Sequence, residues 1–197
     1  WIKGKGLDSG GGNINLNNII INYGPISTFS NYSVISENRL IIKPKGYTFK
    51  EATLFGCALP TGAGIIYNEM KPKKNSSIVI IGLGGVGMSA LIMSIALGHK
   101  NVIAVDNSID RLKQAEKYGV KYLINGNNKN IKNDIFKNFP NGVDFCVEAA
   151  GSISTIELGF SLLNYKSGLL VFASHPKNGD LIKISPHELI SGKSIRG

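Results

Sequence analysis

The sequence predicts an α/β fold in which a doubly wound parallel sheet follows a smaller β-rich segment. From Ser76 onward, apolar runs of strand length alternate with helical patterns. Continuous apolar strands joined by helices are typical of a parallel sheet that is covered on both faces. Before about Pro60, short apolar runs are separated by turns rich in glycine and asparagine, which indicates a small β-rich unit.

Composition narrows the class of protein. The chain has 197 residues, of which 43% are hydrophobic and 18% charged, and this is typical of a globular protein with a sizeable core. No apolar run has the length of a membrane span, and no secretory signal is recognisable, so we expect no membrane association. Two cysteines cannot build a disulfide framework, which favours a cytoplasmic location. The net charge is +9, but the cations are scattered without interleaved aromatics, so we expect no nucleic-acid partner.

The first segment is expected to be strand-rich and then helical. Its elements are a loop over 6–13, strands over 19–24 and 31–36, a turn at Pro44 and Gly46, and helical stretches over 47–70. Thr48 and Glu51 have the spacing of a capping box, in which each side chain accepts a hydrogen bond from the other residue's backbone. We therefore expect a helix to begin directly after Thr48.

The second segment alternates strictly between strands and helices. The strands are expected at 77–82, 101–106, 120–125, 143–151 and 168–174, and the helices at 85–98, 108–119, 130–139 and 153–164. Ser108 is a suitable N-cap for the second of these helices, and Gly98 and Gly119 are suitable ends for the first two. Strands that alternate with helices in this way form βαβ units.

A glycine-rich turn links the first strand of this series to its first helix. Gly82, Gly84 and Gly87 have the G-x-G-x-x-G spacing, with Gly85 and Val86 among the residues between them. The first glycine permits a tight turn, the second lets the backbone approach a pyrophosphate, and the third lets the helix pack closely on the strand. The helix N-terminus offers unpaired N–H groups to phosphates. The motif therefore predicts a Rossmann-type dinucleotide-binding domain.

An acidic residue follows at the position that such a domain uses for ribose binding. Asp106 ends the second strand, 19 residues after Gly87, close to the expected spacing. A carboxylate there accepts a hydrogen bond from the ribose 2′-hydroxyl and repels a 2′-phosphate, which favours NAD over NADP. Two alternatives stay open. Asp106 could be a plain helix cap, and Arg111 could either flank the adenosine ribose or be solvated.

Together with their spacings, several stretches resemble the zinc-dependent medium-chain alcohol dehydrogenases. They are "FGCALPTGAG" at 55–64, "GLGGVG" at 82–87, "VIAVD" at 102–106, and residues 27–40 and 191–197. The resemblance extends from about Gly6 to Gly197. It implies that residues 1–58 are part of a GroES-like catalytic domain and that 59–197 form an NAD-binding Rossmann domain. It also implies an oxidoreductase that transfers hydride between a small-molecule alcohol or aldehyde and NAD.

The same resemblance implies roles for individual residues. Cys57 matches one of three protein ligands of a catalytic zinc, and Thr61 matches a threonine that packs on the nicotinamide ring. Tyr23 falls at a substrate-pocket position. Cys146 lies within an apolar strand and is expected to be a core residue. Residues 147–151 and 173–175 match the strand ends that line the nicotinamide half of the cofactor. The cofactor-binding candidates among them are Ala149, Ala150, Gly151, Ala173, Ser174 and His175.

The chain also departs from the family pattern. No residue matches the other two zinc ligands or the proton relay, so the chain resembles the middle of a longer enzyme. His99 is expected to be solvated, His175 to lie in the cofactor pocket and His187 to lie on a surface helix, so none of them replaces a ligand. We expect this chain alone to bind NAD without oxidising alcohols or holding stoichiometric zinc. The complete enzyme is expected to be a homodimer or homotetramer.

Two other functions are alternatives to this interpretation of the sequence. The chain could be a stand-alone nucleotide-binding or sensor module that has the fold and no catalysis. It could instead belong to a zinc-free quinone or enoyl reductase of the same superfamily, which is usually NADP-dependent. Asp106 and Cys57 both argue against the reductase.

Overall fold

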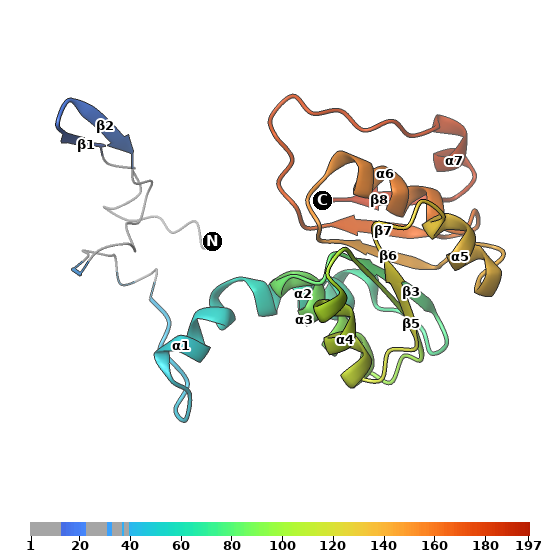
Figure 1. Ribbon diagram of the computed structural model, residues 1–197, viewed down its shortest axis with the longest axis horizontal. Helices are drawn as coiled ribbons and strands as arrows, with labels where there is room; N and C mark the ends of the chain where they lie inside the picture. The colour runs from blue at the N-terminus through green and yellow to red at the C-terminus, as the bar shows by residue number, and fades with distance from the viewer. Residues whose placement is uncertain (1–12, 23–30, 33–36, 38–39) are drawn as a thin grey trace. The chain divides into compact units, whose positions relative to one another are not determined.

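A computed structural model describes residues 13–22, 31–32, 37 and 40–197 (Figure 1). The chain divides between Thr53 and Leu54 into two compact units, and each unit is described by itself. Tyr23 and most of the expected strand at 31–36 lie outside the described residues. The same holds for residues 6–12 of the expected loop and for most of the 27–40 stretch that carried part of the family resemblance.

The first unit contains an antiparallel hairpin of β1 (Asn13–Leu16) and β2 (Ile19–Asn22). The sequence predicted β2 but not β1. Asn17 and Asn18, the two residues of the turn, have φ values of 51° and 62°. Two successive left-handed residues form the turn that matches the twist of a hairpin, and asparagine tolerates this conformation. The Asn-Asn pair was therefore the overlooked signal for β1.

A short helix, α1 (Phe49–Ala52), follows in this unit and begins with the predicted capping box. The Glu51 backbone N–H donates to Thr48 Oγ1 at 3.2 Å, and the Thr48 N–H donates to Glu51 Oε2 at 2.8 Å. The Thr48 hydroxyl also donates to Glu51 Oε2, at 2.8 Å. The two hydrogen bonds that the Thr48 N–H and hydroxyl donate lower the pKa of the Glu51 carboxyl, because they stabilise its ionised form.

The second unit is built on a six-stranded sheet with the order β5-β4-β3-β6-β7-β8, and every pairing in it is parallel. This is the strand order 3-2-1-4-5-6 of the doubly wound dinucleotide-binding fold, so the predicted fold class is confirmed. The strands are β3 (Ser77–Ile81), β4 (Asn101–Asp106), β5 (Tyr122–Asn125), β6 (Phe145–Glu148), β7 (Leu169–Phe172) and β8 (Ser194–Arg196).

Helices cover both faces of this sheet (Figure 1). Because successive strand residues point to opposite faces, Ile78 and Ile80 of β3 pack in one core cluster and Val79 and Ile81 in the other. The first cluster includes residues of α3 and α4, and the second includes residues of α5 and α6. The helices are α3 (Gly85–Ala96), α4 (Ile109–Lys117), α5 (Ile131–Asn138), α6 (Ile153–Leu162) and α7 (Pro186–Ile190).

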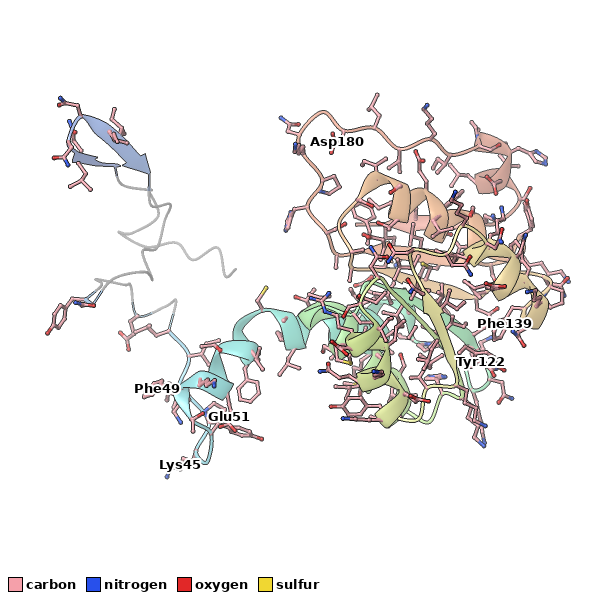
Figure 2. All side chains as sticks on the ribbon, viewed as in Figure 1. Lys45, Phe49, Glu51, Tyr122, Phe139 and Asp180 are labelled. Carbon is pink, nitrogen blue, oxygen red and sulfur yellow. The ribbon has the colours of Figure 1, made fainter. Side chains whose placement is uncertain are left out.

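Side-chain contacts hold these layers together (Figure 2). The Tyr122 ring on β5 meets the ring of Phe139, the C-cap of α5, edge to face, with 5.3 Å between the ring centroids. Ser108 accepts a hydrogen bond from the Arg111 N–H and is the N-cap of α4, as predicted. Cys146 is buried in the core as expected, and burial together with the nearby Glu148 carboxylate raises the pKa of its thiol well above the ordinary value.

A further helical stretch packs on α3. It consists of a 3₁₀ turn, η2 (Thr53–Gly56), then α2 (Ala58–Gly64), which continues into the π-helical turn η3 (Ile65–Met70). The contact with α3 is close, because a Cβ on Gly62 would lie 2.1 Å from the carbonyl oxygen of Val86. The Ser89 hydroxyl of α3 also donates to the carbonyl of Leu59 at 2.7 Å. The glycine and the serine therefore fix α2 against the first turns of α3.

One expectation about the histidines is wrong. His99 was expected to be solvated, but it is only 6% exposed, and its Nδ1 has no hydrogen-bond partner among the described residues. It follows the end of α3, and its backbone N–H donates to the carbonyl of Ser94 at 3.1 Å, which draws the residue inward. Burial lowers the pKa of its imidazole, because the charged form loses hydration. His187 is exposed on α7, as expected.

We predict that Gly62→Ala destabilises the second unit, because the new methyl group would overlap the Val86 carbonyl. Overpacking of this kind costs about 1–3 kcal/mol in the free energy of unfolding, which urea denaturation can measure. Gly64→Ala is the matched control in the same helix, since its Cβ would come no closer than 3.6 Å to another group. A Gly62→Ala chain as stable as the Gly64→Ala chain would contradict this account of the packing.

We also predict that the second unit becomes less stable to unfolding in mild acid. Because the pKa of His99 is lowered from 6.5 in the folded unit, the unfolded chain binds a proton more readily as the pH drops below about 6.5. The free energy of unfolding should therefore decrease between about pH 7 and 5. His99→Gln should make this decrease shallower in urea titrations at several pH values. His187→Gln, on the exposed helix, should leave the slope unchanged, and equal slopes for the two variants would contradict the prediction.

Candidate functional site

The candidate site is a crevice at the carboxyl ends of the central strands. β3 and β6 are neighbours in the sheet, and the strands that follow each of them lie on opposite sides, so this is the topological switch point where such sheets bind ligands. The turns after β3 and β6 meet there, because the Ala149 N–H donates to the Ile81 carbonyl at 2.8 Å. A cavity of about 270 Å³ opens beside them, and its lining includes Gly82, Gly84, Asp106, Arg111, Ala149, Ala150 and Thr155.

Close packing shapes the glycine-rich turn. Gly82 has φ +88°, and a Cβ there would lie 2.6 Å from the backbone nitrogen of Ala150. A Cβ on Gly87 would lie 1.8 Å from the carbonyl oxygen of Gly82, whereas one on Gly84 would meet no atom within 4 Å. The first and third glycines are therefore required by the packing of the protein itself, and the second faces open space.

The N-terminus of α3 adjoins this open space. α3 begins at Gly85, and its N-cap Gly84 supplies no side-chain hydrogen bond to the first turn. The first N–H groups of a helix have no partner within the helix, and they carry a partial positive charge. The arrangement can therefore bind the phosphates of a nucleotide.

Asp106 connects the end of β4 to the glycine-rich turn. Its carboxylate accepts the Leu83 N–H at 2.6 Å and the Ser108 N–H at 2.8 Å, and it is only 7% exposed. Arg111 Nη1 lies 3.6 Å from Asp106 Oδ2. Because Ser108 is the N-cap of α4, Asp106 is not the cap of that helix. Each carboxylate oxygen can accept more than one hydrogen bond, so Asp106 can accept further donors from a ligand in the cavity.

A second carboxylate at this edge, Glu148, lies within the 147–151 stretch that the family resemblance placed beside the nicotinamide, but no role of its own was expected for it. It ends β6 and is completely buried. Its Oε1 accepts the N–H groups of Ala150 and Gly151 and the Thr155 hydroxyl, and its Oε2 accepts the Ser174 hydroxyl. Its place after an apolar strand, like that of Asp106, was the signal that could have found it.

The loop after β7 lies beside the loop after β6. The Ala173 N–H donates to the Glu148 carbonyl at 2.9 Å. Gly151 has φ +90°, and a Cβ on it would lie 3.7 Å from the Ser174 Cβ. His175 follows and is exposed. The structure therefore brings Ala149, Ala150 and Gly151 together with Ala173 and Ser174.

Cys57 and Thr61 lie on successive turns at the start of α2. Cys57 is exposed and is the N-cap of that helix, and the Thr61 N–H donates to the Cys57 carbonyl at 3.0 Å. A Cβ on Gly85 would lie 3.0 Å from the Ala58 Cβ, so the start of α2 adjoins the glycine-rich turn. The backbone of Cys57, which precedes Ala58, therefore lies near the N-terminus of α3.

The described residues do not by themselves fit a zinc site. Zinc is held by three or four His, Cys, Asp or Glu side chains, and no such group of three occurs in the part of the chain that the structure describes. Cys57 offers a single thiolate.

The described part of the chain contains no helix that is both long and apolar enough to cross a membrane.

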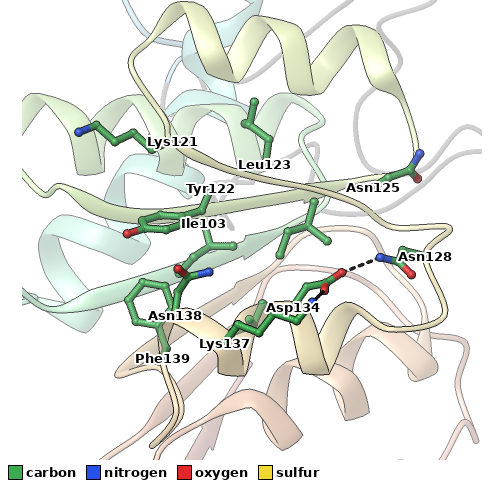
Figure 3. Close-up of a pocket in the computed structure, with 12 residues that line it drawn as sticks. Ile103, Lys121, Tyr122, Leu123, Asn125, Asn128, Asp134, Lys137, Asn138 and Phe139 are labelled. Atoms are coloured by element: carbon green, nitrogen blue, oxygen red, sulfur yellow. Dashed lines mark hydrogen bonds and ion pairs between the residues drawn. The ribbon is translucent and has the colours of Figure 1, made fainter.

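Another cavity, of about 350 Å³, lies between β5 and α5 (Figure 3). It shares no lining residue with the crevice. Asp134 lines it and is paired with Lys137 Nζ at 2.8 Å and with the Asn128 amide at 2.7 Å. The Asp134 carboxylate is therefore already paired and is not a free catalytic acid or base.

Comparisons with known proteins point to one family. Residues 85–197 match the family model described as "Zinc-binding dehydrogenase". "Alcohol dehydrogenase class-2 isozyme 2" of Oryctolagus cuniculus is 32% identical over 174 residues, which are 87% of this chain and 46% of the relative. "Alcohol dehydrogenase class-P" of Arabidopsis thaliana is 30% identical, with 87% and 46% covered.

A solved structure agrees with these relatives. The crystal structure of benzyl alcohol dehydrogenase from Acinetobacter calcoaceticus matches with a TM-score of 0.79 and 30% identity, over 86% of this chain and 47% of that one. The chain thus spans about half the length of the relatives it matches.

Proposed function

Because the chain belongs to the zinc-binding dehydrogenase family, we propose that it is the NAD-binding part of an alcohol dehydrogenase. The reaction is hydride transfer between a small-molecule alcohol or aldehyde and NAD. The observation that carries the proposal is the crevice at the switch point of the sheet. There the glycine-rich turn, the N-terminus of α3 and Asp106 converge on one cavity, as dinucleotide binding requires.

Different residues of the crevice would bind different parts of NAD. The N–H groups at the start of α3 hold the pyrophosphate over Gly84, where no side chain intervenes. Asp106 accepts the ribose hydroxyls, and Arg111 flanks the adenosine. Ala149 to Gly151 and Ala173 to His175 line the nicotinamide half, against which Thr61 packs. When bound, NAD supplies the hydride acceptor, and the protein binds and orients it.

Zinc is part of the proposal for the whole enzyme. Cys57 is the residue of this chain that would ligate it, beside the phosphate-binding turn. One thiolate does not hold zinc in a closed site, so further ligands must come from outside the described residues. The substrate would be bound in the same place, and its identity depends on those ligands and on the pocket around them.

We further propose that the protein is cytoplasmic, as its low cysteine content suggests, and that it assembles as a homodimer or homotetramer. β8 pairs only with β7 in the described sheet, so its outer edge is free to pair with another strand. Edge strands without a partner are usually covered or paired, which supports assembly through this edge.

Gly84→Val should abolish NAD binding and leave the unit folded. The valine side chain would enter the space where the pyrophosphate lies, and no protein atom opposes its Cβ within 4 Å. Calorimetry should detect no NAD binding, and circular dichroism should be unchanged. Gly64→Val, on α2 away from the crevice, is the control and should bind normally. Normal NAD affinity in Gly84→Val would exclude this pyrophosphate site.

Asp106→Asn should narrow the preference for NAD over NADP. The amide keeps the shape and one acceptor oxygen, but it loses the charge that repels a 2′-phosphate. A charge-assisted hydrogen bond contributes about 1.5–3 kcal/mol, so NAD affinity should fall by about ten- to a hundredfold. Dissociation constants for both dinucleotides should be measured. An unaltered chain that binds NADP more tightly than NAD would contradict the assignment of the cofactor.

A further inference from the structure

Glu148 is a buried carboxylate that accepts hydrogen bonds from two backbone N–H groups and two hydroxyl groups. The Ala150 and Gly151 N–H groups lie 2.9 and 2.8 Å from Oε1, and the Thr155 hydroxyl lies 2.7 Å from the same oxygen. The Ser174 hydroxyl donates to Oε2 at 2.7 Å. Both oxygens of Glu148 therefore accept hydrogen bonds, which is the pattern of an ionised carboxylate, because an ionised carboxylate has acceptors only.

These hydrogen bonds tie two loops to one side chain. Ala150, Gly151 and Thr155 belong to the connection from β6 into α6, and Ser174 belongs to the segment after β7. β6 and β7 are adjacent, with Glu148 opposite Phe172. The dinucleotide fold has two mononucleotide-binding halves on either side of the switch point. Asp106, which is proposed to bind the adenosine ribose, lies in the half formed by β3 to β5. Glu148 lies in the other half, which would receive the nicotinamide nucleoside.

No cationic side chain of the described residues forms an ion pair with Glu148. Its side chain is completely shielded from water. Hydrogen-bond dipoles stabilise the anion but do not cancel its net charge. Its effect on a neighbour is visible at Cys146, whose thiol pKa it helps to raise. Weak screening inside the protein lets such a charge act over several ångströms.

We propose that Glu148 selects the oxidation state of the bound dinucleotide. The oxidised nicotinamide ring carries a positive charge and the reduced ring is neutral, so a buried anion below the nicotinamide half stabilises the oxidised form more. Through its hydrogen bonds to both loops, the same residue positions the walls of that half. The inference rests on the proposed NAD site and adds to it a preference for NAD⁺ over NADH that depends on one charge.

The test compares two substitutions that separate charge from contact. Glu148→Gln removes the charge and keeps the length of the side chain, so its amide can still bridge the two loops. Glu148→Asp keeps the charge and shortens the reach to Ser174. Dissociation constants for NAD⁺ and NADH are measured on the chain by calorimetry and nucleotide fluorescence. We expect Glu148→Gln to lower the affinity for NAD⁺ relative to NADH by about three- to tenfold, and Glu148→Asp to weaken both nucleotides with little change in their ratio.

Thr155→Val is a third variant, which removes one donor and leaves the charge in place. It should keep the preference for NAD⁺, and it decides the question together with Glu148→Asp if Glu148→Gln does not fold. An unchanged ratio in Glu148→Gln, or a lost preference in either variant that keeps the charge, would overturn the inference and leave the proposed NAD site standing. An unaltered chain that bound neither nucleotide would overturn the proposed function as well.

Discussion

The close approach of α3 to the end of β3 is the contact on which the crevice depends. Gly87 lies against the Gly82 carbonyl, where a Cβ would come within 1.8 Å. This contact turns the helix N-terminus toward the carboxyl edge of the sheet and leaves Gly84 facing open space. The Leu83 N–H between these glycines is bound by Asp106. The groups proposed to bind the pyrophosphate and the ribose are therefore placed by one packed turn.

Two carboxylates stabilise the two halves of this edge in the same way. Asp106 ends β4 and binds backbone N–H groups of the glycine-rich turn and of Ser108. Glu148 ends β6 and binds backbone N–H groups of the turn that follows it. They differ in exposure to the cavity, because Asp106 lines it and has Arg111 nearby, whereas Glu148 lies beneath its loops. Asp106 can therefore contact a ligand in the cavity, whereas Glu148 is covered by the loops that it binds.

The sequence predicted the order of strands and helices well, because continuous apolar strands and glycine-terminated helices are local signals. It erred at the ends of elements and where contacts between distant residues decided the outcome. The strand expected at 143–151 ends at Glu148, since the next N–H groups turn toward that carboxylate. His99 follows a helix end that looked solvated, but the fold buries it. The role of Glu148 depends on Ser174, 26 residues later, and no local spacing predicts that contact.

The position of Cys57 depends on the same glycine-rich turn, although Cys57 is the N-cap of another helix, α2. Gly62 and Ser89 fix α2 to α3, and Ala58 rests against the start of α3. The place of the Cys57 backbone relative to the start of α3 is therefore set by the packing of two helices inside one unit. A metal ligand at this position would remain in a constant place relative to the dinucleotide, whatever the remaining ligands do.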